Sequence, residues 1–188
     1  MESKSKNNLQ SSANMTETAT HSKLMKLFEE ELKDIYWAEQ KLTKAIPKMI
    51  EKSTSEELKS ALEDHLGETE EHVSRIKRVF SIIDKKAETQ KCQALAGLVD
   101  EAEQIMNDCE DGAMLDAGII AAGQKVEHYE IASYGTLIEF AKTLGFNDVA
   151  DLLAETLKEE KAADEKLSEI AMSEVNALAA SEDGSGLW

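Results

Sequence analysis

The stretch KVEHYEIASYGTL, Lys125–Leu137, decides how this chain folds. The apolar residues around it have the spacing of a helix with one buried face. On a helix, residues three apart lie about 60° apart in projection and residues seven apart nearly coincide. Glu127, Glu130 and Tyr134 therefore share one stripe of that buried face. A core face that carries two carboxylates needs a physical explanation.

The composition predicts an all-α protein. The chain has 188 residues, of which 41% are hydrophobic, enough for one domain with a sizeable core. One proline and nine glycines leave Ala, Leu, Glu and Lys dominant, which is typical of long helices. No stretch has the alternating β-branched pattern of a strand.

Four long amphipathic segments and one shorter segment are expected to be helices. They run from about Ser22 to Lys52, Ser55 to Asp84, Gln93 to Cys109 (the short one), Ala113 to Leu144 and Asn147 to Ala180. Ser55 and Asn147 can cap helix N-termini, and Gly145 is a natural C-terminal stop. Pro47 removes one backbone hydrogen bond and is expected to kink the last turns of the first helix.

The lengths of the connections predict the topology. The first and second helices are joined by a short link, and so are the third and fourth, which predicts two antiparallel hairpins. The stretch between the hairpins, about 28 residues with the short helix, can run back along helices about 45 Å long. One long crossover between two hairpins is the ferritin-like four-helix bundle. We expect this bundle over residues 22–180, a disordered N-terminal tail over 1–21 and a flexible tail over 181–188.

Each predicted inner face carries polar groups near its middle. They are Glu39 on the first helix, His65, Glu68 and His72 on the second, Glu127 and Glu130 on the third, and Glu160 and Asp164 on the fourth. A buried unpaired carboxylate costs several kcal/mol, so four or more would cancel the stability of a domain. These groups must be protonated, paired or bound to metal, and few cationic residues share their faces.

Carboxylates with one or two imidazoles suit two divalent cations such as iron or manganese. Bridging carboxylates from two helices would hold such a pair about 3.5–4 Å apart. Taken alone, a residue of this kind is more often solvated or structural than a metal ligand. The coincidence of depth on four helices is what favours a metal site.

Four stretches carry a family resemblance: DIYWAEQKL, HLGETEEHVSRI, VEHYEIASYGTL and LLAETLKEEKAADEKL. They resemble the four helices of the YciE/YciF family, a branch of the ferritin-like superfamily, from about Lys23 to Ala171. The resemblance implies a four-helix fold with a two-metal centre, a tendency to dimerise, an association with bacterial stress and a ferroxidase-type activity.

The resemblance marks five carboxylates and one imidazole as metal ligands: Glu39, Glu68, Glu127, Glu130, Glu160 and His65. It makes Asp164 either a ligand or a hydrogen-bond acceptor for one. The chain departs from the ferritin-like Glu-x-x-His pattern, because His65 precedes Glu68 and Ala163 stands where the other histidine belongs. His72 could serve instead. Two iron ions are expected, with manganese or another divalent metal as the alternative.

The leading hypothesis for function is a ferritin-like oxidoreductase that binds two Fe(II) ions and passes their electrons to dioxygen or peroxide. A non-enzymatic stress or interaction protein, in which the metal only staples the bundle, is the first alternative. An iron-storage cage ranks lower, because the residues after Ala180 offer none of the extra interface elements of cage ferritins. The resemblance predicts a homodimer.

Charge and cysteine content limit the partners. The formal net charge of −17 repels phosphate backbones, so direct nucleic-acid binding is not expected, although cations would be attracted. Cys92 and Cys109 match no zinc or CxxC spacing, which leaves idle reduced thiols or a redox-sensitive pair.

No stretch approaches the ~20 apolar residues of a membrane span, and the first 20 residues are not a secretory signal. We therefore expect a cytoplasmic protein.

Overall fold

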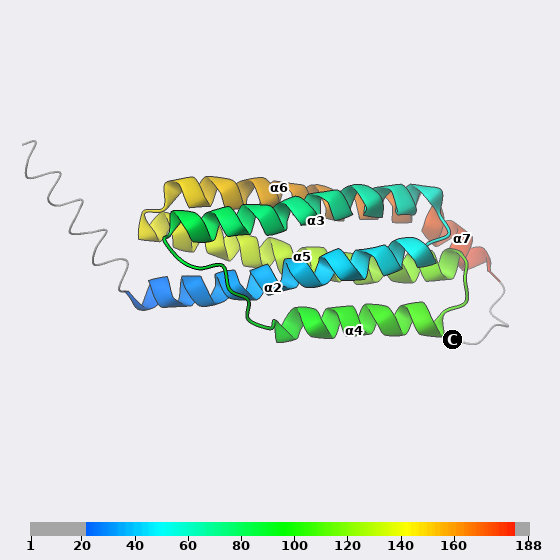
Figure 1. Cartoon of the computed structure of the whole chain (residues 1–188). Helices are drawn as coiled ribbons and strands as arrows, with labels where there is room; N and C mark the ends of the chain where they lie inside the picture. Colours follow the sequence, from blue (N-terminus) through cyan, green and yellow to red (C-terminus); the bar gives the residue numbers. More distant parts are fainter. Residues whose placement is uncertain (1–21, 183–188) are drawn as a thin grey trace, which may run out of the picture.

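The computed structural model describes residues 22–182, and every regular element in that range is helical (Figure 1). The elements are α2 (Lys23–Lys52), α3 (Glu56–Ile82), α4 (Gln93–Asp108), α5 (Ala113–Leu144), α6 (Asn147–Ile170), the π-helix η1 (Ala171–Val175) and α7 (Asn176–Ser181). The all-α prediction is confirmed. The tail predicted over residues 1–21 and the last six residues, 183–188, lie outside the described part of the chain.

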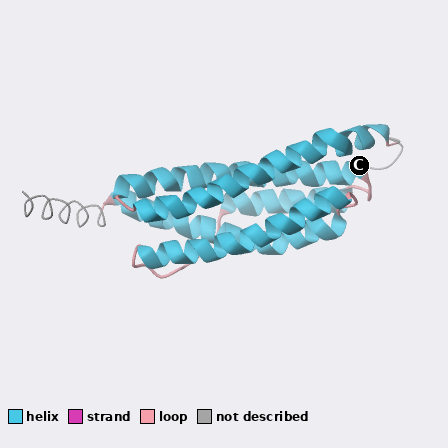
Figure 2. Ribbon diagram, turned by 90° about the horizontal axis from the view of Figure 1, so that it is seen from above, coloured by secondary structure: helices cyan, strands magenta, loops and turns pink. Residues whose placement is uncertain are grey.

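The four long helices α2, α3, α5 and α6 pack along one another, and α4 lies outside α2 and α5 (Figures 1 and 2). Short turns join α2 to α3 and α5 to α6, and the connection from α3 to α5 runs back along the bundle through α4. This is the predicted ferritin-like topology. Helix α2 continues through Pro47 to Lys52, and a kink there stays a prediction.

The turn between α2 and α3 is held by two side chains. Ser55 caps α3 as predicted, because its hydroxyl accepts a hydrogen bond from the Leu58 amide at 3.3 Å. Buried Asp116 of α5 accepts from the Thr54 amide at 2.7 Å, the Ser55 amide at 2.9 Å and the Thr54 hydroxyl at 2.6 Å. One carboxylate therefore ties the first hairpin to the second.

The turn between α5 and α6 is tighter than predicted. Gly145 ends α5 in the left-handed region, at φ 86°, as expected. The prediction that Asn147 caps α6 is wrong, since the cap position belongs to Phe146 and has no side-chain hydrogen bond. The Phe146 amide bonds back to the Ala141 carbonyl at 2.9 Å, and its ring stacks on Phe28. Asn147 is therefore already helical.

The fourth predicted helix is interrupted by the π-helix η1. Leu167 and Ile170 are buried, and an uninterrupted α-helix would next bring position 174 to the inside. The wider π-turn brings Val175 inward instead, 1% exposed, and leaves Glu174 exposed. The extra residue thus exchanges a charged side chain for an apolar one against α5.

The chain beyond this π-turn is tied to the start of α5. Helix α7 ends at Ser181, and the Glu182 carboxylate accepts hydrogen bonds from the Ala113 amide at 2.7 Å and the Met114 amide at 3.0 Å. The first amides of a helix have no partner within it, so this contact caps α5. Glu182, which was expected to be part of a flexible tail, makes this contact.

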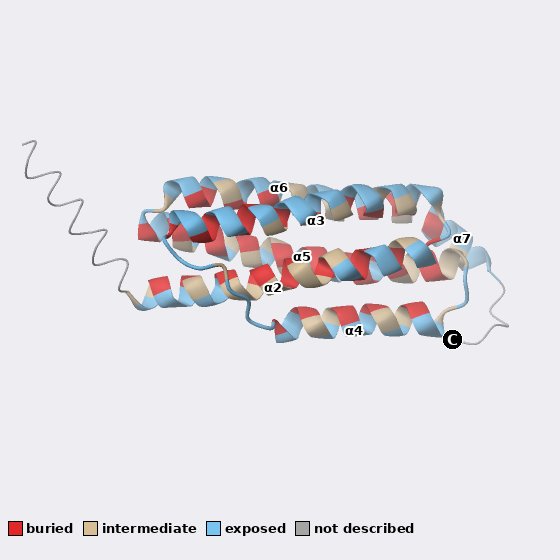
Figure 3. Ribbon diagram, in the orientation of Figure 1, coloured by how far each residue is buried: buried red, intermediate tan, exposed pale blue. Residues whose placement is uncertain are grey.

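The buried faces meet along the axis of the bundle (Figure 3). Helix α3 and its C-cap residue bury one continuous face: Leu58, Leu62, His65, Thr69, His72, Ile76, Val79 and Ile83 are all buried. Helix α4 buries one face, and it can approach α5 closely because Gly118 lacks a side chain. A Cβ atom there would lie 2.6 Å from Ile105 Cγ2. Within residues 22–182, no helix is both long and apolar enough to cross a membrane.

The two cysteines flank α4 and cannot pair within the chain. Cys92 precedes and Cys109 follows a 16-residue helix, which is about 24 Å long, far beyond the ~7 Å limit between Cα atoms of a disulfide. The Cys92 thiol donates to the Tyr129 hydroxyl at 3.2 Å, and that hydroxyl donates to Asp34 at 2.9 Å. Burial raises the pKa of the Cys92 thiol. The structure thus favours a structural thiol.

Candidate metal centre

Six ionisable side chains project into the middle of the bundle, and all four long helices contribute. They are Glu39 of α2, His65 and His72 of α3, Glu127 and Glu130 of α5, and Glu160 of α6. Taken as whole residues, none of the six is more than 8% exposed. Helical spacing explains the pairs, because His65 and His72 are seven residues apart and Glu127 and Glu130 three apart.

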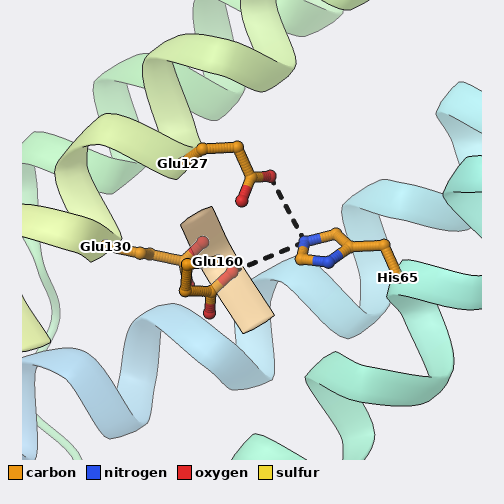
Figure 4. Close-up of side chains that lie close together, drawn as sticks. All are labelled: His65, Glu127, Glu130 and Glu160. Carbon is orange, nitrogen blue, oxygen red and sulfur yellow. Dashed lines mark ion pairs between the residues drawn. The ribbon is translucent and has the colours of Figure 1, made fainter. Parts of the chain in front are cut away.

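These side chains form two groups that share one residue. His65, Glu127, Glu130 and Glu160 each offer a ligand atom within 4.8 Å of the others, and Figure 4 shows them directed at a common space. Glu39, His72 and Glu160 form the second group under the same limit. Glu160 Oε2 lies 4.0 Å from His65 Nε2, and Glu160 Oε1 lies 3.0 Å from His72 Nδ1. Glu160 therefore presents one oxygen to each group, as a bridging ligand would.

The cluster lacks the hydrogen bonds that buried polar groups normally have. Within residues 22–182, all eight buried side-chain atoms without a hydrogen-bond partner belong to these six residues, and Glu130 contributes both of its oxygens. Asp116 is equally buried, yet it accepts three hydrogen bonds. The same protein thus satisfies a structural carboxylate fully and leaves these carboxylates open.

Without metal, the cluster retains protons. Burial raises the pKa of Glu130 well above its usual value, and the charges of Glu160, Glu39 and Glu127 raise it further. Burial also raises the pKa values of Glu39 and Glu160. Burial lowers the pKa values of the two imidazoles, but the neighbouring carboxylates raise them by more.

The pKa values of both imidazoles are therefore raised. The pKa of His72 rises to about 10, mainly through its contacts with Glu160 and Glu39. The pKa of His65 lies well above its usual value, chiefly because of Glu127. Protons therefore occupy the place that cations would take.

Each imidazole has a further carboxylate at its outer nitrogen. His65 Nδ1 lies 3.5 Å from Glu68 Oε2, and His72 Nε2 lies 2.9 Å from Glu159 Oε2. Glu159 is held by Arg75, whose Nη1 donates to the same oxygen at 2.6 Å. Burial would raise the pKa of Glu159, but the bonds from Arg75 and His72 lower it. Outer carboxylates of this kind fix the orientation of metal-binding imidazoles.

The structure places the seven predicted ligands in different ways. It brings five of them together: Glu39, His65, Glu127, Glu130 and Glu160. Glu68 has a 45% exposed side chain on the outer side of His65, and it joins neither group. Asp164 accepts a hydrogen bond from Gln124 Nε2 at 3.3 Å and also lies outside both groups. His72, left open by the sequence, completes the second group.

The contacts of three residues around the cluster were not predicted. Arg75 and Glu159 support His72, and the hydroxyl of fully buried Tyr134 donates a hydrogen bond to Glu39. Helical spacing carried a signal for two of them, since Arg75 follows His72 by three residues and Tyr134 shares the stripe of Glu127. Glu159 had no such signal.

The donor set fits two divalent cations. Four ionised carboxylates with two neutral imidazoles carry four negative charges, which two divalent ions would neutralise. Oxygen ligands with a few imidazoles suit iron or manganese. The arrangement of Glu160 provides one position beside each histidine. The buried clusters can therefore hold metal ions by charge, chemistry and arrangement.

We expect Glu159→Gln to weaken metal binding about 10- to 100-fold, because the outer partner of His72 loses its charge. Glu155→Gln is the matched control, since Glu155 Oε2 also faces Arg75, at 3.6 Å, but its side chain is 63% exposed. Equilibrium dialysis against Mn(II) measures both affinities. Equal affinities would mean that Glu159 serves only Arg75.

We expect metal uptake at pH 7 to release protons, because His72, with a pKa of about 10, is protonated in the metal-free protein. The apparent affinity should therefore rise with pH up to about pH 10. Calorimetric titration of Mn(II) in two buffers of different ionisation enthalpy measures the protons released. Identical heats in the two buffers would contradict the prediction.

The chain is similar to a known protein family and to a known sequence from Escherichia coli. A family model described as "Domain of unknown function (DUF892)" matches residues 23–180. Protein YciF of Escherichia coli is 46% identical over 146 residues, which cover 77% of this chain and 88% of YciF.

Solved structures agree with this match. The crystal structure of the Escherichia coli stress protein YciF has a TM-score of 0.79 at 43% identity, covering 82% of this chain and 98% of YciF. YcfI of Rhodopseudomonas palustris has a TM-score of 0.77 at 44% identity, covering 78% of this chain and 94% of YcfI. A protein from Xanthomonas campestris, at 23% identity and a TM-score of 0.66, shares the fold; the match covers 85% of this chain and 97% of that protein.

Proposed function

This chain belongs to the DUF892 family, and on that premise we propose that it binds two Fe(II) ions in the buried cluster and oxidises them with dioxygen or peroxide. The observation that carries the proposal is Glu160, which turns one oxygen toward each of two histidine-containing groups. Escherichia coli YciF is described as a stress protein, which supports a role for this chain under stress. Manganese is the alternative metal.

In this proposal Fe(II) is the substrate, and the protein supplies ligands and charge. Each of two Fe(II) ions gives up one electron, and one dioxygen takes both electrons with two protons to form hydrogen peroxide. The four carboxylates offset the growing positive charge of the product ions, so they favour Fe(III) over Fe(II). His65 and His72, held by Glu68 and Glu159, complete the ligand set as neutral bases.

The test is an anaerobic titration followed by exposure to air. We expect about two Fe(II) to bind per chain and to be oxidised faster than in buffer, as two-metal sites allow. Stopped-flow absorbance gives the rate, and an oxygen electrode gives the ratio of iron to dioxygen. Binding of two ions without faster oxidation would refute the enzymatic proposal.

A metal-stapled, non-enzymatic protein is the second candidate. The observation in its favour is that every long helix contributes a ligand, so bound metal would cross-link all four helices. A redox-inert bound ion would identify it.

The expectations on assembly and location stay predictions. The YciE/YciF resemblance supports a homodimer, which in solution would have a mass near twice 20.8 kDa. A far larger particle would favour the iron-storage cage. The cytoplasmic location rests on the sequence expectation.

A further inference from the structure

A cavity of about 440 Å³ opens between α3 and α6 and reaches the candidate metal centre. His65 and Glu127 form part of its wall, whereas Glu39, His72 and Glu130 do not. The cavity therefore meets the cluster at one edge only. That edge is also the most accessible, because the His65 side chain is 10% exposed and those of Glu39, His72 and Glu160 are fully buried.

Small side chains on the two facing helices leave this cavity open. Ser60 and Ala61 of α3 lie opposite Ala162 and Ala163 of α6 in its lining. The floor comes from α2 and α5 and is apolar: Leu42, Ile46, Met49 and Val126. Replacing the water on this floor with the apolar surface of a ligand is favourable.

The charges at the cavity select against anions. Glu57, Asp64 and Glu68 are exposed acids in the lining, and within the described residues Lys166 and His65 are its only side chains that can carry a positive charge. Lys166 Nζ is already paired with Glu57 Oε1 at 2.7 Å, and His65 Nε2 already lies 3.3 Å from Glu127 Oε1. A carboxylate, sulfonate or phosphate on a ligand would thus meet repulsion without a free cation to bind it.

We propose that this cavity binds one uncharged, apolar organic molecule, with an end of the molecule against His65 and Glu127. Its volume lies in the range of about 300–1,000 Å³ of small-molecule sites. A molecule seated there covers the accessible edge of the cluster and slows the exchange of bound metal. Binding in the cavity is independent of the proposed iron oxidation; the effect on exchange rests on the proposed metal site.

Two fluorescent probes with the same ring system test the charge preference. N-phenyl-1-naphthylamine is uncharged at pH 7, and 8-anilino-1-naphthalenesulfonate adds a sulfonate to the same skeleton. Titrating the full-length protein with each should give one site per chain for the uncharged probe and about tenfold weaker binding of the sulfonate, equivalent to about 1.4 kcal/mol. Equal affinities, or no saturable binding of the uncharged probe, overturn the proposal.

A pair of variants on α6 tests the location. Ala163→Leu adds three carbons inside the cavity, whereas Ala154→Leu makes the same change at an exposed position outside the lining. The first should weaken binding of the uncharged probe about tenfold and the second should leave it unchanged. Ser60→Leu, on the opposite wall, repeats the test if Ala163→Leu does not fold. Binding that survives filling of the cavity in folded protein overturns the assignment.

Metal release links the cavity to the cluster. With Mn(II) bound, the uncharged probe should slow removal of the metal by a chelator several-fold in the wild type and in Ala154→Leu, but not in Ala163→Leu. Unchanged release with the probe bound shows that the molecule does not reach His65, and overturns that part of the proposal. If the protein binds no metal, the proposed function fails, while the probe titrations still decide whether the cavity binds its ligand.

Discussion

Glu160→Gln is expected to reduce metal binding by more than about a hundredfold and to eliminate the rapid oxidation of Fe(II). Glu160 is the residue shared by both candidate groups, and each of its oxygens faces a different histidine. The amide keeps the shape of the side chain but has one acceptor oxygen, no charge and two N–H donors. One of the two groups would therefore face N–H donors where a cation should bind, and both would lose a negative charge. Anaerobic Fe(II) titration and stopped-flow absorbance measure the two effects.

The matched control is Glu165→Gln, which makes the same change at an exposed position of α6. It should bind and oxidise iron like the wild type. The metal-free Glu160→Gln protein should remain folded, because the change removes a buried charge that burial disfavours. Circular dichroism checks this. A folded Glu160→Gln protein that binds two ions with unchanged affinity would show that Glu160 is not a shared ligand.

Loading two Mn(II) ions is expected to raise the Tm by about 10–20 °C. An ion at a hundred times its Kd stabilises the folded state by about 2.7 kcal/mol, if the unfolded chain does not bind it. For a domain of this size, 1 kcal/mol shifts the Tm by about 2–4 °C. Manganese separates this effect from iron oxidation. Thermal unfolding followed by circular dichroism, with and without metal, gives the shift, and an unchanged Tm would argue against a buried site.

Glu130→Gln should separate the cost of the buried carboxylate from its role as a ligand. The raised pKa of Glu130 means that the folded state holds a proton which the unfolded state has lost, so metal-free stability falls as pH rises above the usual pKa of 4.5. The amide removes this fall. The metal-free variant should thus unfold at a higher temperature than the wild type at pH 8, with a smaller difference at pH 5.

The same variant should lose much of the Tm increase caused by Mn(II), because both oxygens of Glu130 lack any other partner. Glu139→Gln, at an exposed position of the same helix, is the control and should keep the full increase. A full increase in Glu130→Gln would mean that Glu130 is buried for a reason other than metal.

Helical spacing was enough to predict the inner faces and to place all six residues of the cluster on them, together with Glu68 and Asp164. Glu127 and Glu130 could be placed on a core face because 3.6 residues per turn is a local property of the chain. The cost of burying several carboxylates then implied protons, partners or metal. Chain connectivity was equally informative, since short links force antiparallel neighbours and the stretch between Ile82 and Ala113 allows one long crossover.

For a residue near the edge of a buried stripe, spacing could not decide whether its side chain is a ligand or lies outside the cluster. Glu68 is three residues from His65 and Asp164 four from Glu160, so a rotation of the helix by about 60° or less separates a ligand from an outer residue. The packed bundle turns Glu68 to the outer side of His65 and Asp164 toward Gln124. It brings His72 into the second group instead.

The contacts that hold the ligands in place could not be predicted from the sequence. Arg75 meets Glu159, 84 residues away, and Tyr134 meets Glu39, 95 residues away. Local periodicity predicts the direction in which a side chain points from its own helix. Which atoms meet depends on the rotation and axial offset of each helix against three others, and close packing of the whole core sets those quantities.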